Sequence, residues 1–313
     1  MAFVYGTISD ASPGATLYTA IADGLSSEGF TLVDTVVIST RTHKVWKCPA
    51  ASNSHNLDWY LDVVYSTTGA GNMWFAPFEY FDPATDLGYR GIFSSSSSSP
   101  IDTTTFSRYG ATGYALETNW STISTGLNFS TSAASFGYWI SITPNRIAAL
   151  SSVAANDVIY SGFYNPHPLH IAAAGMSILY PLVCTKLHSS GDSGGLNTEA
   201  AFTRVPGATG TGYHFYYSLR IKTSAVTNFF SMPALPSGST TGFSVRGATP
   251  VILMTDDSYT GPATIWGTLH DVAATRTAYT VVRGDTTTIS GNPWILTNSS
   301  AASGTGTSVL FKA

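Results

Sequence analysis

The sequence predicts an α+β fold dominated by β-strands, in which a small region of one helix and an antiparallel sheet precedes a larger antiparallel β-sandwich or barrel. Three observations support this fold class. Clear helical periodicity is confined to one segment, many short runs are rich in β-branched and aromatic residues, and Gly, Pro, Asn, Asp and Ser separate these runs at short intervals. Short connections favour antiparallel strands, because parallel neighbours need long crossovers.

The helix is expected over residues 12–29. Ser12 suits the N-cap and Pro13 suits the first helical position. Gly29 can adopt the left-handed conformation that ends many helices, whereas Gly24 is unfavourable inside one. Apolar residues recur every four positions and form one stripe: Leu17, Ile21 and Leu25.

About four strand-like runs follow the helix: TLVDTVVIS, HKVWKC, LDWYLDVVYST and NMWFAPFEYF. Successive side chains of a strand point to opposite faces, so NMWFAPFEYF and the later run YHFYYSLRI carry aromatic residues on both faces. One aromatic face suits a core. We therefore expect the second face to be covered as well, by another domain or by a neighbouring subunit.

A run of serines at residues 94–100, SSSSSSP, indicates a flexible loop or a linker, and TNWSTISTGLNFSTSAAS beyond it is also polar and loop-like. We assign residues 1–125 to the α+β region, which ends in this Ser/Thr-rich linker, and residues 126–313 to the β-sandwich or barrel region. The strand-like runs of the second region are FGYWISIT, RIAALSS, DVIYSGFY, YHFYYSLRI, FSVRGATPVILMT, ATIWGTLHDV, RTAYTVVRG, NPWILTN and SVLFKA.

Composition excludes several function classes. Charged residues make up 10% of the 313 residues, and the net charge is -4, whereas about a quarter of a typical soluble domain is charged. There is no basic patch for nucleic acid or for an anionic membrane surface. The N-terminus lacks the pattern of a signal peptide, and no apolar run approaches the roughly 20 residues that span a bilayer. We therefore expect a soluble chain that is made in a cytoplasm, does not enter the Sec route and binds neither nucleic acid nor membranes.

The chain has two cysteines, Cys48 and Cys184. Their spacing matches neither a metal knuckle nor a disulfide scaffold, and they allow at most one internal disulfide. We expect two buried free thiols, although the sequence leaves open whether the two residues meet.

The string GDSGG at residues 191–195 matches the surroundings of the nucleophile in chymotrypsin-like serine proteases. His55, Asp102 and Ser193 occur in the required order and are 47 and 91 residues apart, close to the roughly 45 and 93 of that family. The settings of these residues disagree with this hypothesis. His55 lies in the polar turn AASNSHNLD, and Asp102 lies between serines and threonines, whereas the orienting carboxylate must be buried. We expect a Gly/Ser turn around Ser193.

Other polar groups in the sequence lack the pattern of a site. His167 and His170 are flanked by prolines that exclude a helix, and the turn at Asp256 and Asp257 lacks the ligand pattern of a calcium loop. Paired carboxylates can hydrolyse glycosides, but strand alternation explains four acidic residues as outward-facing: Asp58, Asp62, Glu79 and Asp82. Without secretion, three glycosylation sequons have no role: Asn119, Asn128 and Asn298. We therefore expect no catalytic residue, no cofactor and no metal.

Three stretches carry a resemblance to a known class of protein. The first runs from the opening helix through TLVDTV to VWKCPAASNSHNLDWYLDVVYS and FEYFDPATDLGYRGI. The second is ISITPNRIAALSSVAANDVIYSGFYNP, followed by SILYPLVC, and the third is FSVRGATPVILMTDD with the last strand TSVLFKA. In these short segments and in their order, the chain resembles uncharacterised virion structural proteins of the tail, baseplate or neck of tailed bacteriophages. The resemblance covers most of the chain.

The resemblance implies a non-enzymatic scaffold without a cofactor. Such a protein is made in the host cytoplasm without a signal peptide. It forms a ring-like homo-oligomer with copies of itself, and it also contacts other virion proteins. Two alternatives stay open. One is a β-sandwich tip protein that binds a glycan or receptor, because glycan sites expose aromatic residues. The other is the serine protease that uses His55, Asp102 and Ser193.

Overall fold

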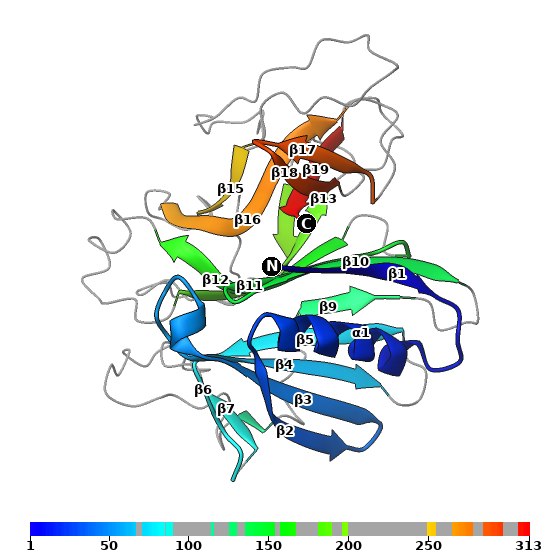
Figure 1. Cartoon of the computed structure of the whole chain (residues 1–313), viewed down its shortest axis with the longest axis vertical. Coiled ribbons are helices and arrows are strands. Elements are labelled where there is room, and N and C mark those ends of the chain that lie inside the picture. The colour runs from blue at the N-terminus through cyan, green and yellow to red at the C-terminus, as the bar shows by residue number, and fades with distance from the viewer. Residues whose placement is uncertain are drawn as a thin grey trace.

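Figure 1 shows a computed structural model of the chain. It describes residues 1–66, 71–84, 86–89, 114–115, 125–129, 135–153, 157–166, 181–189, 196–199, 249–254, 265–277, 284–296 and 306–313. Within these residues the chain forms one α-helix, one 3-10 helix and three sheets whose strand pairs are all antiparallel. The structure therefore confirms a β-dominated α+β fold.

The four strand-like runs after the helix supply the first four strands of a five-stranded sheet in the order β2-β3-β4-β5-β9, and the end of the fourth run continues into a separate strand, β6 (Tyr80–Asp82). Residues 118–135, which the sequence indicated as loop-like, contribute the last of these strands. The strands are β2 (Thr31–Ile38), β3 (Arg41–Cys48), β4 (Trp59–Ser66), β5 (Asn72–Phe78) and β9 (Thr125–Asn128).

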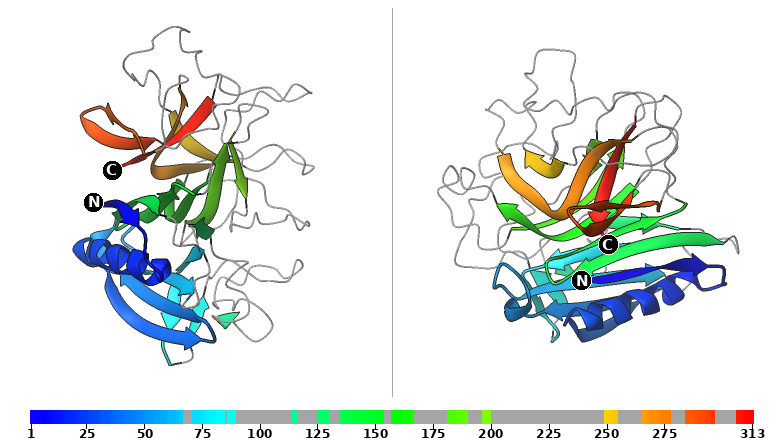
Figure 2. Two further views of the ribbon diagram at one scale, coloured as in Figure 1. Left: turned by 90° about the vertical axis from the view of Figure 1, so that its right-hand side faces the viewer. Right: turned by 45° about the horizontal axis from the view of Figure 1, so that its top comes forward.

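The second sheet has 11 strands and is curled like half a barrel (Figure 2). Its first half follows the order β1-β10-β11-β12, with β13 and β14 beside β12. These strands are β1 (Ala2–Ile8), β10 (Phe136–Thr143), β11 (Arg146–Ser151), β12 (Asp157–Pro166), β13 (Leu182–Ser189) and β14 (Leu196–Glu199). The sequence did not predict β1, which joins a strand more than a hundred residues away.

The other half of this sheet begins where β12 pairs with β16, and it continues through β19 and β18 to β17, with β15 beside β16. Its strands are β15 (Thr249–Met254), β16 (Ile265–Thr277), β17 (Thr286–Ile289), β18 (Asn292–Leu296) and β19 (Gly306–Lys312). A small third sheet is formed by β6 (Tyr80–Asp82), β7 (Leu87–Tyr89) and β8 (Tyr114–Ala115).

The predicted helix is α1 (Pro13–Ser27), and its predicted apolar stripe is buried. Ser12 occupies the N-cap position, but its side chain makes no capping hydrogen bond. Gly29 has a φ of 84°, and the Phe30 amide donates to the Leu25 carbonyl, so the predicted C-terminal cap is confirmed. Gly24 has a packing role, because a Cβ there would lie 2.7 Å from the Ile142 side chain.

The molecule has three layers, and β10, β11 and β12 form the middle one (Figures 1 and 2). A first core fills the space between this layer, the five-stranded sheet and α1, and it includes Leu17, Trp59 and Ile140. A second core lies on the opposite face, beneath β16, β18 and β19. Every residue of β11 is consequently buried. The two predicted regions share the first core, and their division at residue 125 stays a prediction.

The second face of β5 is covered, as its aromatic pattern predicted. Trp74, Ala76 and Phe78 point away from the first core and pack with Phe81 of β6. The cover includes the next strand of the same chain, whereas the sequence analysis expected another domain or a neighbouring subunit. The other two-faced aromatic run, YHFYYSLRI, lies outside the described residues.

Both cysteines are buried thiols outside any disulfide, as predicted. Cys48 Sγ donates to the Pro144 carbonyl at 3.2 Å, and Cys184 Sγ donates to the Phe75 carbonyl at 3.2 Å. Burial raises the pKa of the Cys48 thiol to about 11. Each thiol thus acts as a small buried donor to a backbone carbonyl.

No helix among the described residues is long and apolar enough to cross a membrane.

Gly162 permits close packing between β12 and the turn before β11. A Cβ at this position would lie 2.4 Å from the Asn145 carbonyl oxygen and 2.5 Å from Arg146 Cα, and the φ of Gly162 is 146°. Backbone atoms cannot move aside as the end of a flexible side chain can. The sequence DVIYSGFY therefore needs its glycine.

We predict that Gly162→Ala lowers the free energy of unfolding by about 2–3 kcal/mol, because the added methyl overpacks a backbone contact. Urea unfolding followed by tryptophan fluorescence measures this loss. Gly291→Ala is the matched control, since Gly291 has a φ of 79° and nothing within 4 Å of its Cβ position; it costs roughly 1 kcal/mol of left-handed strain. Equal losses in the two variants would contradict the packing argument.

Candidate functional site

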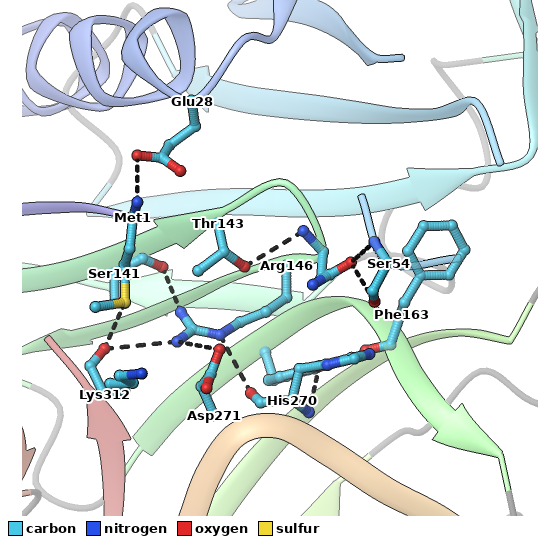
Figure 3. Close-up of polar contacts among 12 residues, drawn as sticks. Met1, Glu28, Ser54, Ser141, Thr143, Arg146, Phe163, His270, Asp271 and Lys312 are labelled. Carbon is cyan, nitrogen blue, oxygen red and sulfur yellow. Dashed lines mark hydrogen bonds and ion pairs between the residues drawn. The ribbon is translucent and has the colours of Figure 1, made fainter. Parts of the chain in front are cut away.

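The turn between β10 and β11 connects the middle layer to the five-stranded sheet. The Pro144 carbonyl accepts hydrogen bonds from Trp59 Nε1 at 2.9 Å and from Cys48 Sγ at 3.2 Å. Next to it, Asn145 Oδ1 accepts from the backbone N and the Oγ of Ser54 at 2.9 and 3.0 Å (Figure 3). Side chains of β3 and β4 and the loop between these strands thus donate hydrogen bonds to this turn.

Arg146 follows this turn, and its guanidinium is completely buried. Nη1 donates to the Ser141 carbonyl at 2.7 Å, Nε to the His270 carbonyl at 3.2 Å, and Nη2 to the Lys312 carbonyl at 3.5 Å (Figure 3). The nearest carboxylate oxygen, Asp271 Oδ2, is 3.9 Å from Nη2. The charge is therefore held mainly by backbone carbonyls of β10, β16 and β19, and only weakly by an anion.

Tyr160 supports the same region from β12 and is also buried. Its hydroxyl donates to the Phe163 carbonyl and accepts from the His270 backbone N–H at 3.1 Å. Burial raises the pKa of Tyr160 above its ordinary value, so the hydroxyl stays protonated and can fill both roles.

Two histidines meet beside Arg146. His55 belongs to the loop after the 3-10 helix η1 (Ala50–Ser52), and His270 belongs to β16. Their Nε2 atoms are 2.9 Å apart, and the His55 ring packs on the Phe163 ring with centroids 4.4 Å apart. Burial is the main cause that lowers the pKa of both rings, to about 4 for His270. Both imidazoles are therefore neutral at pH 7.

The loop that carries His55 is held in shape by Asn53, which is buried. Asn53 Nδ2 donates to the Leu57 carbonyl at 2.8 Å and to the Pro49 carbonyl at 3.2 Å. Its Oδ1 accepts from the backbone N–H of His55 at 3.1 Å. The polar residues of AASNSHNLD therefore form an ordered turn, and this turn packs against the 11-stranded sheet.

Of the three residues of the protease hypothesis, the structure describes only His55. Asp102 and Ser193, and with them the GDSGG string, lie outside the described residues. The Nε2 atom, which a catalytic histidine of this type uses toward its serine, makes a hydrogen bond to His270. The triad itself stays an untested hypothesis.

The prediction that all four acidic residues face outward is wrong for two of them. Asp62 of β4 is completely buried, because the second face of the five-stranded sheet is covered. Glu79 lies between β5 and β6 and is 5% exposed. Asp62 Oδ2 pairs with Nδ1 of His43 at 2.8 Å. Sequence reasoning missed His43, although its place two residues before Val45 on one strand face was a usable signal. Asp58 does face solvent and pairs with Lys47 at 2.6 Å.

The His43–Asp62 pair resembles the base and orienting carboxylate of a hydrolase in its geometry. Its side chains are only 1% and 0% exposed, so a substrate cannot reach them. Asp62 Oδ1 has no hydrogen-bond partner among the described residues. We interpret the pair as a buried structural contact between β3 and β4.

The structure does not test the other positions that the sequence analysis considered. His167, His170, Asp256, Asp257, Asn119 and Asn298 lie outside the described residues, and of Asn128 only the backbone, in β9, is described. Within the described part of the chain, no group of three or more His, Cys, Asp or Glu side chains could hold a metal ion.

No protein-family model matches the chain, and no curated protein matches it either. The groups around Arg146 and the two histidines are therefore interpreted from their geometry alone. They comprise a buried cation, a protonated tyrosine and two neutral imidazoles, all bound to one another or to backbone. This arrangement connects five strands, β10, β11, β12, β16 and β19, with the loop that carries His55, and we call it the polar junction.

We predict that Arg146→Met lowers the free energy of unfolding by about 3 kcal/mol, because it leaves the buried Ser141 carbonyl and the part-buried His270 carbonyl without this donor. Urea unfolding measures the loss. The matched control is Lys44→Met, which removes a partly exposed cation that donates to Thr35 and costs less than about 1 kcal/mol. A loss for Arg146→Met no larger than for the control would show that the carbonyls find other donors.

Proposed function

We propose that this chain is a non-enzymatic structural component of a tailed-bacteriophage virion, in the tail, baseplate or neck, and that it assembles with copies of itself through the edge strand β2. The resemblance of its sequence segments to those of virion proteins supports the role as a virion component. The exposed apolar edge of the five-stranded sheet supports the assembly through β2 and is the observation that carries it.

Strand β2 is eight residues long, and among the described strands it pairs with β3 alone. It exposes Leu32 by 45%, Val33 by 37% and Val37 by 65%. A long edge strand with exposed apolar side chains is a template for pairing with another chain, and monomeric proteins normally protect such edges with Lys or Pro. Strand β2 contains neither residue.

A second copy of the chain fits this edge. Main-chain pairing between strands does not depend on sequence, so β2 of one copy can pair with an exposed edge strand of another copy. Asp34 is the one charged residue of β2, and its Oδ1 accepts a hydrogen bond from the Thr35 N–H. With a net charge of -4 on 313 residues, copies of the chain repel one another weakly.

The second sheet also ends in an edge, because among the described strands β1 pairs with β10 alone. Tyr5 of β1 is 69% exposed. Two different edges on one molecule allow a head-to-tail contact, and such contacts close into rings when the rotation between copies permits. This arrangement supports a ring-like assembly.

We predict that the wild-type chain self-associates and that Val37→Lys makes it monomeric, because a charge on the edge must be desolvated when the strands pair. Sedimentation velocity over a range of concentrations measures the oligomeric state, and thermal unfolding checks that the fold is intact. Val153→Lys is the matched control, since Val153 is 47% exposed and lies outside β2; it leaves self-association unchanged.

Two results would overturn the assembly proposal: a wild-type chain that stays monomeric at high concentration, or equal association of wild type and Val37→Lys. The virion location has its own test. An antibody against the chain is expected to label the tail, baseplate or neck of particles of the phage that carries its gene. Tight, saturable binding on a glycan array, or peptidase activity that Ser193→Ala abolishes, would instead favour one of the two alternatives.

A further inference from the structure

The His55–His270 contact joins two parts of the fold that are 215 residues apart in sequence. The two Nε2 atoms are 2.9 Å apart, and the ring centroids are 5.1 Å apart with the planes at 87°. This centroid distance is close to the largest that two imidazoles with nitrogens at 2.9 Å can have. The two Nε2 atoms therefore lie nearly on the line between the ring centres, and each faces the other head-on.

This head-on geometry fits a hydrogen bond and does not fit a metal site. Two histidines that bind one ion direct their lone pairs to a common point about 2.0–2.1 Å from each nitrogen. With the nitrogens only 2.9 Å apart, this would tilt the rings and bring their centres closer than the observed 5.1 Å. In addition, no third His, Cys, Asp or Glu among the described residues completes such a site. The contact consequently consists of one proton between two nitrogens.

The number of protons decides whether this contact holds. In the neutral pair, one Nε2–H donates and the other Nε2 accepts. A first additional proton can occupy an Nδ1 atom and leave that hydrogen bond in place. When both rings are protonated, both Nε2 atoms carry hydrogens, and two cationic donors face each other at 2.9 Å. The contact then becomes repulsive.

The surroundings do little to compensate two positive charges. His55 packs on the uncharged ring of Phe163, and burial lowers its pKa. Around His270, burial and His55 lower the pKa, Asp271 raises it, and the Arg146 guanidinium lowers it again. The hydroxyl of Tyr160, protonated because burial raises its pKa, accepts the His270 backbone N–H. Asp271, the one anion in this set, is also the carboxylate nearest to Arg146.

We propose that the His55–His270 hydrogen bond is an acid-released latch. It holds the loop of residues 50–57, which begins with η1, against β16 and opens when both rings are protonated. Opening is local. The contacts of Pro144 with Trp59 and of Arg146 with the Ser141 and Lys312 carbonyls contain no group that titrates in this range. Opening of the latch thus separates the loop from β16 and leaves both cores in place.

The direction of the pH effect follows from the pKa shifts. Both folded-state values lie below the ordinary 6.5, and that of His270 is about 4. The opened form therefore binds protons more tightly than the closed form. The latch contributes its full stability above about pH 6.5 and loses it progressively as the pH falls toward 4.

Hydrogen exchange measured by mass spectrometry tests the latch. After correction for the intrinsic effect of pH, amides of residues 50–57 and of the first half of β16 are expected to lose at least about tenfold of their protection between pH 7 and pH 4. Amides of α1 serve as the internal control and keep theirs. In His270→Gln the side-chain amide can still form a hydrogen bond with His55 but does not titrate. The protection of the same backbone amides is therefore expected to change much less with pH in this variant.

Equal loss of protection in wild type and His270→Gln, or no loss in wild type, would overturn the proposal. Titration of the wild-type imidazoles by NMR gives a test that needs no variant: both pKa values are expected below 6.5, and a value at or above 6.5 for either ring contradicts the latch. Micromolar Zn²⁺ that protects the loop in wild type at pH 7 but not in His270→Gln would replace the latch by a metal site.

Discussion

The buried guanidinium of Arg146 is the interaction on which the layered fold depends. A cation without water must find acceptors inside the protein, and Arg146 finds them on three strands, at Ser141, His270 and Lys312. These carbonyls belong to β10, β16 and β19, so one side chain fixes where the second half of the large sheet folds back over the first. The hydroxyl of Ser141, which donates to the Lys312 carbonyl at 2.6 Å, reinforces the same closure.

This closure is non-local, because Arg146 and Lys312 lie 166 residues apart. The guanidinium lacks one of its acceptors until β19 has joined the sheet. Likewise, β1 cannot pair until its partner β10, from the middle of the chain, is present. Long-range pairings of this kind slow folding, since the entropy of loop closure is lost before the contacts form. We infer that the two cores form cooperatively, with the middle layer common to both.

What the sequence predicted was local, and what it missed was long-range. The helix and the strands β2 to β5 follow from periodicity and from nearby turn residues, and the structure confirms them. Strand β1 was missed because its pattern is short and its partner is distant. Asp62 was placed outward because alternation identifies two faces of a strand but not which face is covered; Phe81 of β6 helps to cover this one. The partner of His55 is equally invisible, since His270 comes from the far end of the chain.

The spacing of His55, Asp102 and Ser193 illustrates why residue positions along a chain do not establish chemistry. Each neutral imidazole nitrogen either donates one proton or accepts one, and Nε2 of His55 already does so with His270. For His55 to act as a base toward a serine, this hydrogen bond would have to break, and the ring would have to leave its contact with Phe163. The same atom cannot hold β16 against the loop and accept a proton from a nucleophile at one time. A catalytic role and the observed junction are therefore competing states of His55, and the closed state found here has its Nε2 committed to structure.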